Sequence, residues 1–211
     1  MLYQMGTADT ITPDRVALDG GDDAEEGGEN VLVLADSMSC DADEYCAAQL
    51  GSADAAPAPN LLLVSLDDTP DSRFDAVVRR GPGRPANVAV VCADETRGAA
   101  AARQTGAPGV GPGPWTATVS SPADLTGLGV RIEQVISAWA DGPEPVVLCF
   151  HSLTTLCQYV DDRAAFRFCH TVTRHLDSVG ASSHFHLDPA AVDDRTVATL
   201  SALFDRVEDY T

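Results

Sequence analysis

The chain has 211 residues and a formal net charge of −19, from 32 acidic and 13 basic side chains. All 13 basic residues are arginine, because the sequence contains no lysine. A chain this acidic, without a basic stripe, is not expected to bind nucleic acid by neutralising phosphates, or to dock on an anionic membrane surface. The lack of lysine also excludes Schiff-base chemistry, a Ser-Lys dyad and a phosphate-loop lysine.

The acidic composition also indicates an environment. Asp outnumbers Glu 24 to 8. At molar salt the Debye length falls to about 3 Å, so repulsion among surface carboxylates is weak. We therefore expect a protein adapted to a salt-rich, haloarchaeal-type cytoplasm. Residues 1–11 lack the basic and apolar regions of a signal peptide, and no apolar run approaches the ~18 residues of a membrane span.

The beginning of the chain differs from the rest. The acidic, glycine-rich stretch DGGDDAEEGGE at 19–29 predicts a flexible leader at 1–28 before a single domain at 29–211. None of the six cysteines forms a CxxC pair, so we expect small buried side chains rather than a zinc or disulfide framework. The six are Cys40, Cys46, Cys92, Cys149, Cys157 and Cys169.

From Asn30 onward, short apolar runs alternate with segments of helical periodicity. Continuous runs such as NVLVLA predict strands buried on both faces, and spaced apolar residues predict amphipathic helices. In chain order we predict a strand at 30–35, a helix at 39–50, a strand at 60–66, a helix at 70–80, a strand at 87–93, a loop at 104–114, a strand at 115–121, a helix at 121–140, a strand at 145–150, a short helix at 152–160, a helix at 161–179, a strand at 182–187 and a last helix at 193–207.

Two helix ends carry specific expectations. At 121–140, Ser121 is expected to cap the helix, with Pro122 in the first position and Asp124 three residues after the cap. In the last helix, Phe204 and Val207 are expected to face inward. The alternation as a whole predicts a three-layer α/β domain, with a mainly parallel central sheet and helices on both faces.

Ligands of open α/β sheets bind at the carboxyl ends of the strands, so the turns there are the places to search for chemistry. The turn after the first strand, ADSMSCDADE, has neither the glycines nor the lysine of a phosphate loop, and its four acids would repel a triphosphate. The glycine-rich GAPGVGPGP at 106–114 is rich in proline, which has no N–H, and is interpreted as a connector. No GxSxG elbow is present, and no cysteine has an activating pattern beside it.

Histidines provide the other candidates. His151 follows the strand at 145–150, where many nucleotide hydrolases place a magnesium-holding Asp, but imidazole is a poor magnesium ligand. His184 and His186 alternate on one strand and so share a face. With Asp188 they form HFHLDP, which resembles the HxHxDH signature of metallo-β-lactamase-like hydrolases, with Pro189 in place of the last His. A metal site of His151, His184, His186 and Asp188 is therefore an open alternative to a structural role.

From Asn30 to Asp209 the chain resembles the KaiC/RecA-like ATPase core. NVLVLADSMSCDADEYCAAQL is similar to the strand, phosphate loop and helix of that fold, PVVLCFHSLTTLCQYVD to its metal-binding strand, and DRTVATLSALFDRVED to its closing helix. More narrowly, SMSC, DLTGLG, CFHSLTTLCQYVD, AFRFCH and HFHLDP resemble segments of small haloarchaeal proteins called HTR-like.

The resemblance implies a RecA-like domain that has lost ATP hydrolysis, because the phosphate-loop glycines and lysine are missing and His151 replaces the metal-holding Asp. It assigns vestigial nucleotide positions to Ser37, Met38, Ser39, Cys40, Asp41, His151 and Ser152.

The expected function follows from this loss. We expect no cofactor, and a regulatory or scaffolding role in signalling through protein partners, with self-assembly as a further expectation. Two alternatives remain open. One is a metal-binding protein or metallohydrolase that uses His151, His184 and His186. The other is a nucleotide sensor without hydrolysis, in which Arg97 and Arg103 contact phosphate.

Overall fold

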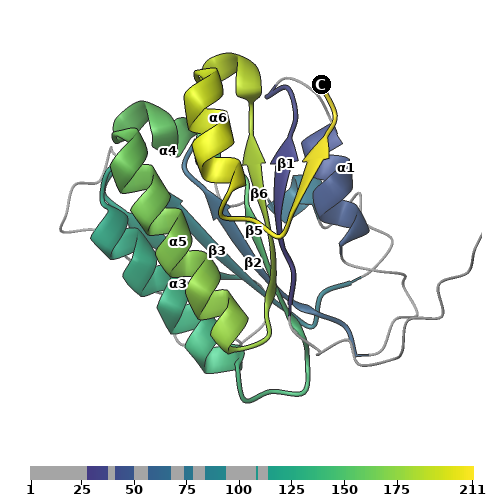
Figure 1. Cartoon of the computed structure of the whole chain (residues 1–211). Coiled ribbons are helices and arrows are strands. Elements are labelled where there is room, and N and C mark those ends of the chain that lie inside the picture. The colour runs from purple at the N-terminus through teal and green to yellow at the C-terminus, as the bar shows by residue number, and fades with distance from the viewer. Residues whose placement is uncertain are drawn as a thin grey trace, which may run out of the picture.

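The computed structural model of the protein describes residues 28–37, 41–49, 57–67, 74–77, 84–93, 108 and 114–211. Within these ranges, seven parallel strands form one sheet (Figure 1). The strands are β1 (Asn30–Leu34), β2 (Asn60–Ser65), β3 (Asn87–Ala93), β4 (Trp115–Val119), β5 (Val146–Phe150), β6 (Ser182–Leu187) and β7 (Arg206–Asp209). Their order across the sheet is β4-β3-β2-β5-β6-β1-β7.

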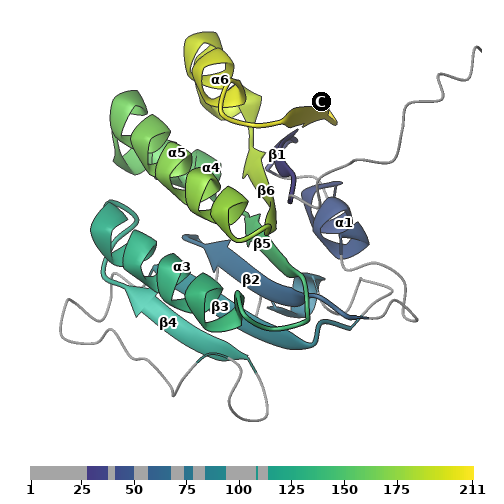
Figure 2. The same cartoon turned by 60° about the horizontal axis from the view of Figure 1, so that its bottom comes forward.

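Helices cover both faces of this sheet, as Figure 2 shows for α1 on one side and α3 and α5 on the other. The helices are α1 (Asp41–Ala48), α3 (Leu125–Trp139), α4 (Leu153–Tyr159), α5 (Asp162–Ser178) and α6 (Asp194–Ser201), with a short 3-10 helix at Pro189–Ala191. Residues 74–77 are also helical. The three-layer α/β fold expected from the sequence is confirmed.

Burial of the strands follows from their place in the sheet. Every residue of β1, β2 and β5 is buried, as expected for strands with a neighbour on each side and helices on both faces. Buried and partly buried residues alternate along β4, which lies at an edge. The apolar runs therefore identify the centre of the sheet.

Strand alternation divides the core into two layers. The larger layer packs one face of the sheet against α3, α4, α5 and α6, and it includes Leu32, Leu62, Phe150 and Phe185. The layer on the other face is smaller and contains Cys46 of α1 with Leu61, Leu63 and Cys149. Phe150 and Phe185 stack at a centroid distance of 5.1 Å in the larger layer. The face covered by α1 holds the chemistry described below.

The first turn of α3 differs from the prediction. The helix begins at Leu125, and its N-cap is Asp124, whose carboxylate accepts a hydrogen bond from Gly127 N at 2.9 Å. Ser121 Oγ instead accepts from Ala123 N in the turn before the helix, so Ser121 is not the cap and Pro122 is not in the first helical position. Asp is as good a cap as Ser, and the sequence offered both.

The end of the chain is a second correction. α6 ends at Ser201, and 206–209 form β7, a parallel edge strand paired with β1. Asp205 starts this pairing, because its backbone N–H donates to Asn30 O and its carboxylate accepts from Asn30 N. Phe204 packs against the core as expected, but Val207 is 41% exposed. Helical periodicity cannot reveal that β1 has an open edge which a later segment pairs with.

Several predictions lie wholly or mostly outside the described residues: the leader at 1–28 except its last residue, nearly all of the loop at 104–114, and most of the helix at 70–80. In the parts of the chain that the structure does describe, no helix is long and apolar enough to span a bilayer.

Candidate functional site

Two neighbouring features lie where β1, β5 and β6 approach α1. One is a buried cluster of thiol and imidazole side chains, which we call the Cys–His cluster: Cys46, Cys149, His184 and His186. The other is a polar cavity at the carboxyl ends of the strands. His186 belongs to both, so the cluster and the cavity adjoin at this residue.

The two strands β5 and β6 supply three members of the Cys–His cluster. His184 and His186 point to the face that α1 covers, and Phe185 between them points into the opposite core layer. Cys149 of β5 is the register partner of His184. Adjacent strands in register bring side chains of one face close together, so the pairing alone places a thiol beside two imidazoles.

Helix α1 supplies the fourth member. Cys46 Sγ lies 3.0 Å from His184 Nε2 and 3.2 Å from His186 Nε2. One donor atom from each of the four residues lies within 4.8 Å of those of the other three. The side chains are nearly inaccessible, with exposed fractions of 0% for Cys46 and Cys149, 2% for His184 and 4% for His186. The group is thus compact and shielded from water.

The environment changes the acidity of these groups. Burial by itself would raise the pKa of Cys149, but hydrogen bonds from Cys46, His184 and His186 and the charge of His184 lower it well below its usual value. Burial lowers the pKa of His186 to about 4. By contrast, burial raises the pKa of Cys169, a thiol equally buried in the other core layer. Cys149 is therefore chemically different from an ordinary core cysteine.

Tyr45 of α1 closes one side of the cluster. Its ring meets those of His184 and His186 edge-on, at centroid distances of 5.4 and 6.2 Å. The ring of Tyr210, beyond β7, approaches Tyr45 at 6.1 Å. Aromatic rings in these arrangements pack favourably and exclude water.

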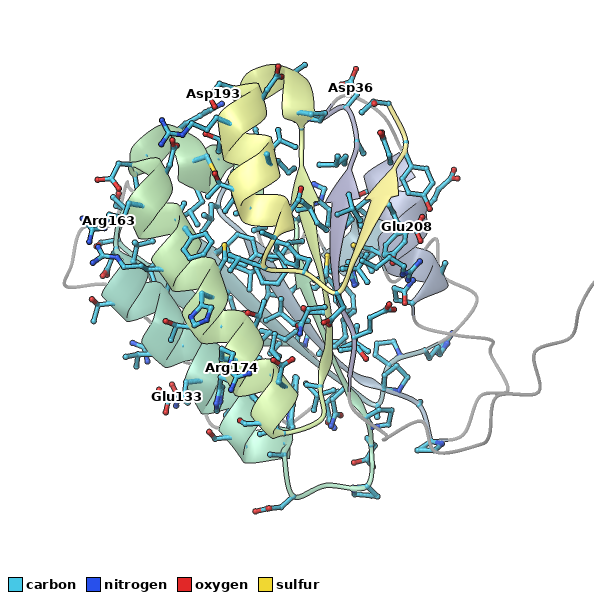
Figure 3. The ribbon with its side chains drawn as sticks, viewed as in Figure 1. Asp36, Glu133, Arg163, Arg174, Asp193 and Glu208 are labelled. Carbon is cyan, nitrogen blue, oxygen red and sulfur yellow. The ribbon has the colours of Figure 1, made fainter. Side chains whose placement is uncertain are left out.

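The polar cavity has a volume of about 320 Å3. It lies at the edge of the sheet where ligands of α/β folds bind, and Figure 3 shows Asp36 at that end of the molecule. Four carboxylates are among the described residues that line it, together with hydroxyl, amide and imidazole groups. The lining residues are Ala35, Asp36, Ser37, Asp43, Asp67, His151, Ser152, Thr154, Thr155, Gln158, His186, Leu187 and Asp188.

Hydrogen bonds give the cavity wall a defined shape. Ser152 Oγ donates to Asp67 at 2.5 Å and accepts from Leu66 N at 2.9 Å, and Thr155 Oγ1 donates to Asp67 at 3.1 Å. Burial raises the pKa of Asp67, but the bonds from Ser152 and Thr155 and the charge of His151 outweigh it, so the pKa is lowered. Asp67 is consequently an ionised carboxylate at neutral pH.

The residues of the expected metal site are divided between the Cys–His cluster and the cavity, with His186 in both. His184 and His186 lie in the Cys–His cluster, whereas His151 and Asp188 line the cavity and are not members of it. His151 follows the end of β5, and its ring lies 5.5 Å from that of His186. The Asp188 carboxylate accepts hydrogen bonds from Ser37 N and Ala190 N, so it joins the turn after β1 to the turn after β6. The metal grouping expected from the sequence stays a prediction, and the structure brings Cys46 and Cys149 to its two strand histidines.

Three of the expected nucleotide positions lie at the same edge. Ser37, His151 and Ser152 line the cavity, and Ser152 binds Asp67. Asp41 is the first residue of α1, and Met38, Ser39 and Cys40 lie outside the described residues.

Sequence reasoning missed Cys46 and Cys149 as possible ligands. Their spacing in the chain matches no metal motif, because the ligands come from two strands and a helix. The signal that could have found Cys149 is its place in a buried strand of the same sheet as HFH. Using that signal requires knowing that β5 and β6 are neighbours and in which register.

Comparisons with known proteins provide a family and a fold. The sequence pattern of the family described as "Family of unknown function (DUF7504)" matches residues 28–208. No curated protein matches the chain. A solved structure, "Structural study of Project ID PH0250 from Pyrococcus horikoshii OT3", is similar, with a TM-score of 0.52 and 13% identity over 88% of this chain and 83% of that chain. At this identity the likeness concerns the fold alone.

Proposed function

The chain belongs to the DUF7504 family of unknown function, and we propose that it is a non-catalytic regulatory protein that acts through contacts with other proteins. The observation that carries the proposal is the charge of the cavity at the carboxyl edge of the sheet. Asp36, Asp43, Asp67 and Asp188 line it, and no arginine is among the described residues around it. Such a cavity repels the phosphates that this edge of an active NTPase binds.

The sheet order supports the interpretation as an NTPase-like domain without activity. β6 alone lies between β1 and β5, so the turn after β1 and the end of β5 open into the same cavity. In the resemblance to RecA-like ATPases these two places correspond to the phosphate loop and the metal-binding strand. The turn after β1 carries Asp36, whose negative charge repels phosphate. The end of β5 carries His151, an imidazole in place of the oxygen ligand that magnesium needs.

The alternatives are less well supported. A metallohydrolase needs a metal with an open coordination position for water. The Cys–His cluster offers four protein donors and is buried, which is the form of a closed site. A nucleotide sensor that uses Arg97 and Arg103 has no support from the described cavity, because both residues lie outside the described ranges.

Calorimetry at high salt tests the absence of nucleotide chemistry. Mg-ATP and Mg-GTP titrated into the full chain are expected to give no saturable heat, and phosphate release is expected to equal that of a protein-free blank. Saturable binding with turnover of either nucleotide would refute the proposal.

The regulatory part needs a separate experiment. The tagged full chain is used to capture proteins from native high-salt lysate, and any captured protein is purified and titrated back. A saturable, stoichiometric complex is expected. A chain that binds no protein at any concentration would count against a role through protein contacts.

A further inference from the structure

We propose that Cys46, Cys149, His184 and His186 bind one zinc ion in tetrahedral coordination. This site goes beyond the proposed regulatory function and does not depend on it. Three ligands come from the paired strands β5 and β6, and the fourth comes from α1, which covers the face of the sheet that carries the other three. A pair of strands and a covering helix can therefore surround an ion.

The distances fit a tetrahedral ion. With zinc–sulfur bonds of about 2.3 Å and zinc–nitrogen bonds of about 2.0 Å, the donor atoms around one zinc lie about 3.3–3.8 Å apart. Cys46 Sγ lies 3.0 and 3.2 Å from the two Nε2 atoms, and all four donors lie within 4.8 Å of one another. Changes of about 1 Å in the donor–donor distances would suffice.

The donor set selects zinc over harder cations. Thiolate and imidazole are the ligands of structural zinc sites, whereas magnesium and calcium require oxygen. Charge balance points the same way. A zinc ion with two thiolates and two neutral imidazoles has no net charge, so the complex avoids most of the cost of burying an ion. Full burial of all four residues is compatible with such a neutral complex.

Such a site would connect α1 to the sheet. Among the described side chains of α1, only Cys46 and Ala47 are buried, and both are small. Small side chains bury little apolar area, so they contribute less to docking than Leu or Phe would. A zinc bond through Cys46 would add a strong tie between the helix and strands β5 and β6. All four positions are filled by protein, which indicates a structural ion rather than a hydrolytic one.

The competing interpretation is a metal-free cluster held by hydrogen bonds between thiols and imidazoles. Metal content distinguishes the two. The full chain, purified at high salt without chelators and equilibrated with zinc, is expected to retain one zinc per chain by elemental analysis. Cys149→Ser is expected to lower zinc affinity at least about tenfold. The matched control is Cys169→Ser, which alters an equally buried thiol in the other core layer and should retain zinc.

Cobalt reports on the ligands without relying on a variant that folds. Wild-type protein loaded with cobalt is expected to show the visible bands of tetrahedral coordination and a thiolate-to-cobalt charge-transfer band. Folded wild-type protein that takes up no added zinc would overturn the proposal. So would zinc bound equally by Cys149→Ser and wild type, or a cobalt spectrum without thiolate ligation.

Discussion

Asn30 is a buried polar residue that connects β1 to two other elements. Its side chain donates to Asp177 of α5 at 2.6 Å and accepts from Ser183 of β6 at 2.6 Å. The residue is 2% exposed, so these groups have little access to water. Buried polar groups of this kind specify one arrangement of strands, because any other arrangement leaves them unpaired.

We therefore expect Asn30→Ala to lower the free energy of unfolding by about 1–3 kcal/mol, since it removes two hydrogen bonds and leaves the hydroxyl of buried Ser183 without its partner. Denaturant titration at high salt measures the change. Thr171→Ala is the control, because it removes an exposed bond to Arg167 O within one helix and should change stability far less. Equal losses of unfolding free energy in the two variants would show that the buried hydrogen bonds of Asn30 stabilise the fold no more than an exposed one.

Asp67 gives a pH-dependent prediction. Its pKa in the folded protein is lowered, so its ionised form stabilises the fold above the unfolded pKa of about 3.9, and this contribution is lost as pH falls through the folded pKa. The melting temperature of Asp67→Asn should lie below that of wild type at pH 6, and the gap should narrow as pH falls below about 4. Thermal melts across this range test it. The control is Asp141→Asn, at an exposed position outside the cavity, whose melting temperature should stay close to that of wild type. A melting-temperature difference between Asp67→Asn and wild type that does not depend on pH would contradict the prediction.

At the scale of elements, helix α1 is where the proposed zinc site has consequences. Its described buried side chains are small, and Tyr45 contacts the two histidines of the cluster. The larger core layer on the other face, with α3 and α5, needs no such tie, because it buries large residues such as Leu128, Ile132 and Phe168. Stability is therefore expected to differ between the two faces.

Metal removal should affect α1 selectively. After chelation, hydrogen exchange is expected to speed up in α1 and around the ligands in β5 and β6, and to change little in α3 and α5, because only α1, β5 and β6 carry ligands. Exchange measured by mass spectrometry with and without chelator tests this. In Cys46→Ser the chelator should have no further effect. A uniform increase over the whole chain would instead indicate that the ion stabilises the entire fold.

Element positions show what periodicity can and cannot reveal. Buried strands were predicted within about two residues, because a strand between two helix layers must be apolar throughout. The helix predicted over 193–207 was wrong in its second half, where β7 pairs with β1. That outcome depends on an open sheet edge formed by a segment about 175 residues earlier, as the Asn30–Asp205 contact shows.

At the scale of the whole molecule, the main feature is the net negative charge of −19. Charged side chains project outward from the helices, as Figure 3 shows for Glu133, Arg163 and Arg174. Arg206 forms an ion pair with Glu29 at 3.1 Å, but acidic side chains outnumber basic ones 32 to 13 over the whole chain. Repulsion among the acidic side chains is expected to destabilise the fold at low ionic strength.

Salt should therefore raise the melting temperature. We expect a rise as potassium chloride increases from millimolar to molar concentrations, because screening weakens the repulsion. Differential scanning calorimetry measures it. A neutral osmolyte at matched osmolality is the control and should give a smaller rise. A melting temperature independent of salt would show that the acidic surface does not limit stability.

The sequence by itself determined the fold class, the positions of the central strands and the acidity of the cavity edge. These properties depend on local features, namely apolar runs, helical periodicity and the residues that follow each strand. The tertiary structure decided which strands are neighbours, and so which side chains meet. His184 and His186 were visible as a same-face pair, but only strand register and the docking of α1 bring Cys149 and Cys46 to them. Ligand sites assembled from distant segments depend on contacts in space, and neither spacing nor composition records those contacts.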